Sequence, residues 1–181
     1  MKLMIASDIH GSAKFCSLML RRFQEEQADR LLLLGDILYH GPRNDLPEEY
    51  APKQVLAMLN EVKEKIFCVR GNCDTEVDQM VLEFPIMSDY AVFPVKKRLI
   101  YACHGHHGNE QTPPPLCQGD LLLCGHTHVP KCMDHGGFVY LNPGSVSIPK
   151  NGSCHSYMML ENGVFLWKDI LNGEIYQTYS I

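Results

Sequence analysis

The first part of the chain alternates short apolar runs with segments that are apolar on one side only. Hydrophobic residues recur every three to four positions in residues 13–27 and 52–65, which predicts two amphipathic helices. Ser12 is a suitable N-cap for the first helix, and Pro52 suits the first turn of the second. Short apolar runs predict buried strands at residues 3–7, 30–34 and 66–69. Strands that alternate with helices predict a parallel sheet.

The second part of the chain has short β-rich runs instead of long amphipathic segments. Two Asn-Gly pairs, at residues 162–163 and 172–173, are flanked by β-formers and predict hairpins. Strands are predicted at residues 91–95, 99–103, 121–124 and 138–141. We therefore expect an α/β fold, with a parallel or mixed sheet in the N-terminal half and a mostly antiparallel sheet in the C-terminal half. At this length the chain is expected to form a single domain over residues 1–181.

Polar residues follow directly after several of the predicted strands. Residues 31–36 are the clearest case, because four leucines and a glycine lead into Asp36. The carboxyl ends of strands in an open α/β sheet lie side by side, so these residues are expected to converge. They are Asp8, His10, Asp36, Asn72, His104, His126 and His128. Nitrogen and oxygen donors suit Mn²⁺, Fe²⁺, Ni²⁺ or Zn²⁺, and seven donors suit two ions that share one carboxylate.

Composition narrows the class of protein. Hydrophobic residues make up 45% of the chain and charged residues 20%, as in ordinary globular proteins. The net charge of -5 argues against nucleic acid as an obligatory partner, because nucleic-acid-binding surfaces are usually basic. No segment approaches the ~18 apolar residues of a membrane span, so no membrane partner is expected. The eight cysteines contain no Cys-x-x-Cys pair, and no signal peptide is evident; we expect reduced thiols and a cytoplasmic location.

The polar motifs also resemble a known family. In order they are Asp8-Ile9-His10, Gly35-Asp36, Gly71-Asn72, His104 and Gly125-His126-Thr127-His128, and their order and spacing resemble the metallophosphoesterase (calcineurin-like) superfamily. Residues 40–44 and 142–149 resemble, within it, the small single-domain bacterial phosphodiesterases. The resemblance implies a four-layer α-β-β-α sandwich. Residues 142–145 follow a predicted strand, and their glycine allows close approach of the backbone, so we expect them to pack beneath the metal-binding loops, with a role at the edge of the site as the alternative.

The resemblance further implies how the donors divide between two divalent ions. The first ion would take Asp8, His10 and His128. The second would take Asn72, His104 and His126, with Asp36 bridging both. Mn²⁺ is the first expectation, with Zn²⁺, Ni²⁺, Fe²⁺ or Mg²⁺ as alternatives. Two such ions can hold a hydroxide between them and clamp the oxygens of a phosphate.

Cys73 departs from the wider superfamily, which has a histidine at this position that protonates the leaving group or stabilises the transition state. A thiol has an unperturbed pKa of ~8.5 and is a weak hydrogen-bond donor, so it would serve poorly. This favours either substrates with good leaving groups or a proton donor from elsewhere, for which His106, His107 and His40 are candidates. Asn72, His104 and His106 are the catalytic candidates. Tyr39 replaces a common acid and indicates altered support for the site. Asp74 is expected to accept a hydrogen bond from a ligand histidine.

These features favour a metal-dependent phosphodiesterase that acts on a small phosphodiester. A diester carries less negative charge than a monoester and so needs fewer basic residues. Arg43 and Arg70 are candidates for phosphate contact, with a surface or ion-pair role as the alternative, which is favoured for Arg70. The alternatives are a phosphomonoesterase and a non-catalytic interaction module on the same fold. A carbon–nitrogen or ester hydrolase is a third reading, but its usual motif His-x-His-x-Asp-His is absent. The β-rich C-terminal part offers edges for a homodimer or homotetramer.

Overall fold

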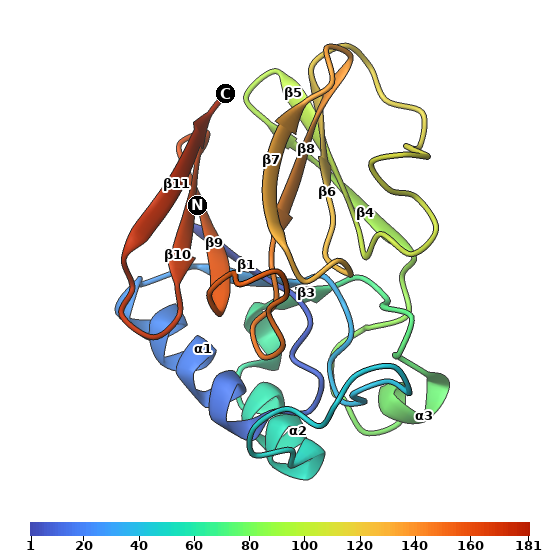
Figure 1. Cartoon of the computed structure of the whole chain (residues 1–181), viewed down its shortest axis with the longest axis vertical. Coiled ribbons are helices and arrows are strands. Elements are labelled where there is room, and N and C mark those ends of the chain that lie inside the picture. The colour runs from blue at the N-terminus through green and yellow to red at the C-terminus, as the bar shows by residue number, and fades with distance from the viewer.

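Two sheets make up most of the computed structural model, which describes all residues 1–181 (Figure 1). The first sheet has the order β11-β10-β9-β1-β2-β3. Its parallel half consists of β1 (Leu3–Ala6), β2 (Arg30–Leu33) and β3 (Ile66–Cys68). Its antiparallel half consists of β9 (Ser156–Glu161), β10 (Val164–Asp169) and β11 (Ile175–Ser180). The first and last parts of the chain therefore share one sheet.

Both predicted Asn-Gly hairpins are confirmed in this sheet. Asn162 and Gly163 join β9 to β10 with φ values of 52° and 79°, as a two-residue turn with two left-handed positions requires. The second pair lies between β10 and β11, where Gly173 has a φ of 78°. Such turns match the twist of the strands, so the end of the chain folds back on itself as an antiparallel meander.

The second sheet has the order β4-β5-β6-β8-β7. Its strands are β4 (Tyr90–Val95), β5 (Arg98–Cys103), β6 (Asp120–Leu123), β7 (Pro130–Asp134) and β8 (Phe138–Pro143). The outer pairs β4–β5 and β7–β8 are antiparallel, whereas β5, β6 and β8 run parallel. Pairing in the C-terminal half of the chain is thus mostly antiparallel, as predicted, but this half is divided between the two sheets and has a parallel centre.

The leucine run before Asp36 is buried on both faces, as its sequence predicts. Leu31 and Leu33 join the core between the first sheet and its helices, whereas Leu32 and Leu34 join the core between the two sheets. Successive side chains of a strand point to opposite faces, so an uninterrupted apolar run is what a strand in the middle of a layered fold needs. Full burial fixes the backbone that leads into Asp36.

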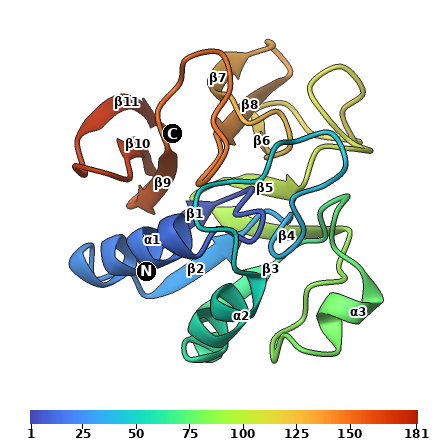
Figure 2. The same cartoon turned by 60° about the horizontal axis from the view of Figure 1, so that its bottom comes forward.

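Two helices cover the outer face of the first sheet (Figure 2). Helix α1 (Ala13–Glu25) begins at Ser12, whose side chain accepts a hydrogen bond from the Phe15 N–H. Helix α2 (Pro52–Asn60) begins at the proline and is followed by a 3₁₀ turn at Lys63–Lys65, so the predicted helix is shorter than expected. None of the helices is both long enough and apolar enough to cross a bilayer.

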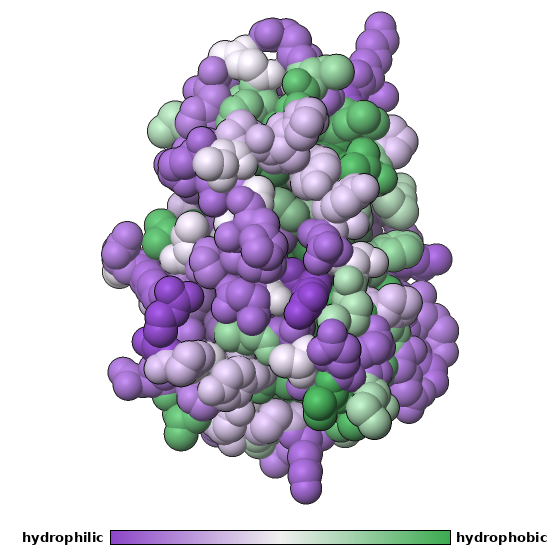
Figure 3. Space-filling view, turned by 90° about the vertical axis from the view of Figure 1, so that its right-hand side faces the viewer, coloured by the Kyte–Doolittle hydropathy of each residue, from purple (hydrophilic) through white to green (hydrophobic).

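The expected fourth layer is not helical. The last helix in the chain is the short α3 (Glu76–Gln79). Neither α3 nor β7 was predicted from the sequence. On the outer face of the second sheet, Leu116 from the 104–119 loop packs on Leu122 and Tyr140. This apolar cluster has only four buried residues, so a loop is sufficient to cover it. The loop lies on the right of Figure 1, and the face of the molecule on that side is mostly hydrophilic (Figure 3).

Candidate metal centre

The polar residues that follow the strands meet where the two sheets come together. Asp8, Asp36 and Asn72 lie just beyond β1, β2 and β3 of the first sheet. His104 directly follows β5 of the second sheet, and His126 and His128 lie beyond β6. Parallel strands end at the same edge of a sheet, so this gathering follows from the topology. The structure brings all seven predicted ligands together.

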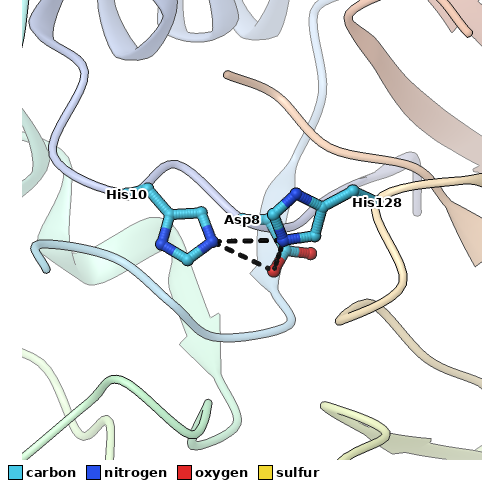
Figure 4. A group of neighbouring side chains, drawn as sticks. All are labelled: Asp8, His10 and His128. Atoms are coloured by element: carbon cyan, nitrogen blue, oxygen red, sulfur yellow. Dashed lines mark hydrogen bonds and ion pairs between the residues drawn. The ribbon is translucent and has the colours of Figure 1, made fainter. Parts of the chain in front are cut away.

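One group consists of Asp8, His10 and His128 (Figure 4). The Nε2 atoms of the two histidines are 3.2 Å apart. Asp8 Oδ1 lies 3.2 Å from His128 Nε2 and 3.6 Å from His10 Nε2. All three side chains are almost fully buried. Three donor atoms from two loops thus face one point.

A second group consists of Asp36, His104 and His126. Asp36 Oδ2 lies 3.4 Å from His104 Nε2 and 3.6 Å from His10 Nε2, so this one carboxylate oxygen reaches toward both groups. His126 Nδ1 is 3.1 Å from His104 Nε2. The Asn72 side-chain oxygen is 3.0 Å from the same His104 nitrogen.

Backbone carbonyls orient three of the histidines. The Nδ1 atoms of His10, His104 and His128 lie 2.8, 2.6 and 2.7 Å from the carbonyl oxygens of Tyr39, Leu34 and Ile148. A carbonyl can only accept, so each Nδ1 carries the hydrogen and each neutral ring turns the lone pair of Nε2 toward the site. This is the arrangement that metal-binding histidines need. Tyr39 therefore supports the site through its main-chain carbonyl, whereas many superfamily members have an acidic side chain at this position.

The donor set fits bound cations. Asp8 Oδ1 is buried and has no hydrogen-bond donor. It faces Nε2 atoms whose lone pairs also point inward, and such lone pairs at about 3 Å repel each other unless positive charge lies between them. Divalent ions would provide that charge, and nitrogen and oxygen donors are the ligands that Mn²⁺, Zn²⁺, Fe²⁺ and Ni²⁺ accept.

Protons supply positive charge when cations do not. Burial alone would lower the pKa of His104, but the hydrogen bond to Asp36 and the charges of Asp8 and Asp36 raise it to about 9. Burial would raise the pKa of Asp8, yet the nearby His10 and His128 rings, when protonated at Nε2, hold it well below its usual range. Cation binding at these residues therefore displaces protons.

The backbone is left-handed at five of the seven residues. Asp8, His10, Asp36, His126 and His128 have φ values of 59°, 49°, 57°, 65° and 61°. Non-glycine residues rarely adopt this region, and each instance costs on the order of 1 kcal/mol or more. Such conformations persist only where the surrounding structure enforces them, and they concentrate at functional sites.

Close backbone contacts enforce this geometry. A Cβ at Gly35 would overlap the Gly71 backbone nitrogen, and one at Gly125 would overlap Ser7 Oγ, so only glycine fits before Asp36 and His126. Asp74 accepts hydrogen bonds from the backbone N–H groups of Asp36, Ile37 and Gly71, at 2.8, 2.9 and 2.7 Å. The expectation that Asp74 supports a ligand histidine was wrong, because it supports the main chain instead.

Residues 142–149 lie beneath the metal loops, as expected. The hydroxyls of Ser145 and Ser147 donate to the Asp8 carbonyl at 2.9 and 3.0 Å. The Asn142 side chain donates to the Gly125 carbonyl at 2.7 Å, directly before His126. One segment thus supports a loop from each sheet.

A polar cavity of about 360 Å³ opens over the centre. It is lined by Asp36, Arg43, Asn44, Asn72, His126, Thr127, His128 and Lys150. Arg43 and Lys150 are exposed and form no salt bridge, so both can meet an anion. Sequence reasoning proposed Arg43 but missed Lys150. Lys150 could have been found from its position directly after residues 142–149.

His106 and Cys73 lie at the edges of the centre. The His106 ring is 5.4 Å from that of His104 and 6.2 Å from that of His126, but it lines a separate cavity of about 80 Å³. Burial and the nearby histidines lower its pKa to about 4. Burial and the Asp36 charge raise the pKa of the buried Cys73 thiol to about 12, which disfavours a thiolate nucleophile. Arg70 donates to the Asp74 carbonyl and so has a structural contact.

The fold and this set of donors together define a metallophosphoesterase architecture. A model of the calcineurin-like phosphoesterase superfamily domain matches residues 1–163. The phosphodiesterase YfcE of Escherichia coli K12 is 50% identical over 164 residues, which cover 91% of this chain and 89% of that protein. The chain belongs to the calcineurin-like phosphoesterase superfamily.

Solved structures agree with this assignment. The structure of the E. coli phosphoesterase YfcE superposes with a TM-score of 0.96 at 46% identity, over 100% of both chains. Wild-type Vps29 of Entamoeba histolytica, solved with Zn²⁺, superposes with a TM-score of 0.60 at 18% identity and covers 99% of both chains. The second likeness shows the shared fold alone. The predicted fold type is confirmed, and this fold implies divalent metal ions.

Proposed function

We propose that the chain is a metal-dependent phosphodiesterase that hydrolyses a small phosphodiester at a centre of two divalent cations. The observation that carries the proposal is the pair of donor groups that share Asp36, beneath a polar cavity with two unpaired cationic side chains. Asp8, His10 and His128 would hold one cation. Asn72, His104 and His126 would hold the other, with Asp36 between them.

Bound cations would supply Lewis-acid activation of a water nucleophile and neutralise charge on the phosphate. The protein's own side chains bind and orient the substrate. Arg43 and Lys150 extend into the cavity that Asn72 and His126 also line, so they can hold phosphate oxygens on the open side of the centre. The Asn72 side-chain oxygen lies 3.0 Å from His104 Nε2, and the two residues are proposed to fix the phosphoryl group from the closed side.

His106 is the proposed hydrogen-bond donor to the leaving oxygen. Its Nδ1 is buried without a partner, and its ring lies beside both His104 and His126. Because its pKa is lowered to about 4, it is neutral near pH 7 and offers an N–H without adding charge. Cys73 occupies the position of the superfamily histidine, and its thiol is a weak donor.

A diester is the favoured substrate class for two reasons. The relative at 50% identity is named a phosphodiesterase. In addition, only two basic side chains line the cavity, which suits a substrate with one negative charge better than one with two. Mn²⁺ is the proposed metal, and its identity has to be measured.

Two further proposals concern the cellular compartment and the oligomeric state. All eight cysteines are free thiols, which supports a reducing compartment such as the cytoplasm. A homodimer or homotetramer is proposed because β4 is an edge strand with exposed apolar side chains, among them Tyr90 and Val92.

The test is hydrolysis of a chromogenic phosphodiester and a chromogenic monoester by protein reconstituted separately with Mn²⁺, Zn²⁺, Ni²⁺ and Mg²⁺. We expect turnover of the diester, fastest with Mn²⁺, and loss of turnover in the double variant Asp36→Asn, His126→Ala. Asp45→Asn, an exposed carboxylate outside the centre, serves as the matched control. Preferential turnover of the monoester would favour a phosphomonoesterase. No turnover of either ester by the metal-loaded protein would favour a binding module.

A separate experiment tests the proposed role of His106 by comparing substrates with poor and good leaving groups. His106→Ala is expected to lower kcat for a diester with a poor leaving group more than for one with a good leaving group. His135→Ala, an exposed histidine that belongs to neither donor group, is the control. Equal losses for both leaving groups would contradict the role of hydrogen-bond donor.

A further inference from the structure

Two buried thiols lie side by side immediately behind the candidate metal centre. Cys103 ends β5, Cys124 follows β6, and their Sγ atoms are 3.6 Å apart. Both sulfurs face the carbonyl oxygen of Gly108, at 3.3 and 3.9 Å. A disulfide has an S–S length of about 2.05 Å, so the two sulfurs would have to approach by about 1.5 Å. No other pair of the eight cysteines has sulfur atoms in contact.

One of these thiols can be reached from solvent. Cys103 lines the cavity of about 80 Å³ that His106 and His107 also line. A water molecule takes up about 30 Å³, so this cavity admits a molecule as small as hydrogen peroxide. Cys124 is fully buried and does not line the cavity. The two thiols therefore differ in access, which defines an order of reaction.

We propose that Cys103 and Cys124 form a reversible disulfide in response to peroxide, and that this modification weakens the second metal position. In the first step the Cys103 sulfur attacks a peroxide oxygen, the O–O bond breaks, and a sulfenic acid and water result. In the second step the Cys124 sulfur attacks the Cys103 sulfur and the S–O bond breaks, releasing a second water with the Cys124 proton. Two thiols lose two electrons in total, and one peroxide molecule accepts them.

The position of the pair couples it to the centre. His104 directly follows Cys103, and His126 lies two residues after Cys124. The backbones are joined at this point, because the Gly125 N–H donates to the His104 carbonyl at 2.9 Å. Gly105, directly after His104, packs closely against Cys124, because a Cβ at Gly105 would lie only 3.2 Å from Cys124 Cβ. Close-packed interiors transmit shifts such as the approach of the two sulfurs, and here they reach His104 and His126.

Reversibility is expected from the location of the pair. Paired strands lie about 4.8 Å apart, near the lower end of the 4.4–6.8 Å that disulfide Cα atoms span, so a bond between these two strands is strained. Strained disulfides have more oxidising potentials and are reduced readily. Cellular thiols would then restore the open form. The inference concerning metal rests on the proposed function, whereas formation of the cross-link does not.

The first experiment detects the bond itself. The full-length protein is treated with hydrogen peroxide, its free thiols are alkylated, and its peptides are analysed without reduction by mass spectrometry. We expect a peptide pair joined through Cys103 and Cys124, which disappears after treatment with dithiothreitol. In Cys124→Ala we expect a sulfenic acid at Cys103, trapped by dimedone, and no cross-link. Cys117→Ser, which removes an exposed thiol, should behave like the unsubstituted protein.

The second experiment measures the consequence. Oxidised protein is expected to bind the second equivalent of Mn²⁺ about 10- to 100-fold more weakly than reduced protein, the range found when the support of metal ligands is disturbed. Cys103→Ser and Cys124→Ala should keep reduced-state affinity after peroxide, with thermal unfolding confirming that both are folded.

Two results would overturn the proposal. If Cys103 and Cys124 both remain alkylatable after peroxide while Cys117 reacts, the pair is not a site of oxidation. If the cross-link forms but Mn²⁺ affinity stays the same, the bond is not coupled to the centre. A protein that forms the cross-link but binds no Mn²⁺ even when reduced contradicts the proposed metal function, and with it the claimed coupling, while the modification itself stands.

Discussion

At the scale of single residues, the donors of the candidate centre depend on unusual backbone conformations. Five of the seven have left-handed φ values, and their loops are held by glycines, by Asp74 and by residues 142–149. A side chain on such a backbone points where a regular strand or helix could not direct it. The protein therefore stabilises each donor with main-chain contacts from a different part of the chain.

The shared position of Asp36 leads to a prediction about metal content. Asp36→Asn should reduce bound Mn²⁺ from two equivalents to fewer than one, because its Oδ2 faces both donor groups. His10→Ala should lose chiefly one equivalent, because His10 belongs mainly to the group with Asp8 and His128. Elemental analysis after dialysis measures both, with Asp45→Asn as the control. Equal losses in the two variants would contradict a bridging role.

A second prediction concerns the open side of the centre. Arg43→Ala and Lys150→Ala should each raise KM for a phosphodiester about tenfold, since a charged hydrogen bond contributes roughly 1.5–3 kcal/mol and exposure reduces its value. Lys53→Ala removes an exposed charge from α2 and should leave KM unchanged. Steady-state kinetics at several salt concentrations test this. A loss of kcat at constant KM would assign the two residues a different role.

Most of the residues of the candidate site could be predicted from the sequence. The seven donors are recognisable because each follows an apolar run, and the order of the motifs resembles a family. Lys150 and the backbone partners of the histidines were not predictable, since main-chain carbonyls carry no sequence signal. Nor were the left-handed conformations. Aspartate and histidine are enriched there among non-glycine residues, but most residues of both types have negative φ, so residue type alone does not identify these positions.

At the scale of elements, one acidic side chain joins α1 to the first sheet. Glu26, at the C-terminal end of α1, accepts a hydrogen bond from Tyr157 of β9 at 3.0 Å and pairs with Lys168 of β10. Lys2, just before β1, lies 3.4 Å from the same carboxylate. Side chains from β9, from β10 and from the residue before β1 thus contact the carboxylate at the end of α1.

This contact predicts how stability depends on pH. Burial would raise the pKa of Glu26, but hydrogen bonds from Lys168, Tyr157 and Lys2 lower it below its ordinary value of 4.5. A carboxylate with a lowered pKa stabilises the folded state above the unfolded pKa and loses that effect as pH falls through the folded pKa. Glu26→Gln should therefore destabilise the protein at neutral pH, and the difference should shrink below about pH 4.5.

Urea unfolding at a series of pH values measures this effect. Glu25→Gln is the matched control, because the Glu25 side chain is half exposed and pairs only with Arg21 and Arg22. A difference between unsubstituted protein and Glu26→Gln that stays constant as the pH is lowered would show that the ion pairs contribute nothing.

Elements with regular patterns were predictable and short ones were not. Both long helices and nearly all strands have the expected periodicity or turn residues. Helix α3 has only four residues, and its start at Thr75, where the side chains of Thr75 and Asp78 cap each other's backbone, resembles an ordinary turn in the sequence. Strand β7 contains Pro130 and Lys131, which local preference does not place in a strand.

At the scale of the whole molecule, one fully buried indole connects the two sheets. Trp167 of β10 donates from Nε1 to the Asn142 carbonyl of β8 at 2.7 Å. Asn142 in turn donates to the Gly125 carbonyl in the loop that carries His126. The core between the sheets thus extends to the candidate centre.

Removal of this hydrogen bond should be costly. Trp167→Phe should lower the free energy of unfolding by about 1–3 kcal/mol, because the Asn142 carbonyl loses its buried donor. Tyr179→Phe removes a polar atom from a partly exposed ring and should change stability by less than about 0.5 kcal/mol. Chemical denaturation compares the two variants. Similar values for both would show that the link between the sheets has little energetic weight.

The assembly of the sheets was the least predictable feature. Local patterns identified the last three strands, but not that they extend the first sheet beside β1. Nor did they show that a loop, and not a helix, would cover the second sheet. Both outcomes depend on which apolar faces are left uncovered once the whole chain is present, and no local window contains that information.

The place of β1 between β2 and β9 has a consequence for synthesis. Leu3 pairs with Arg30 on one side and with Leu160 on the other, so this strand gains its second neighbour only after nearly the whole polypeptide has left the ribosome. Until then the nascent protein carries an open, apolar strand edge, the kind of surface that chaperones bind and that promotes aggregation. Asp8 likewise gains His128 as a neighbour only after most of the chain has been synthesised, so the donor group of Asp8, His10 and His128 is completed late.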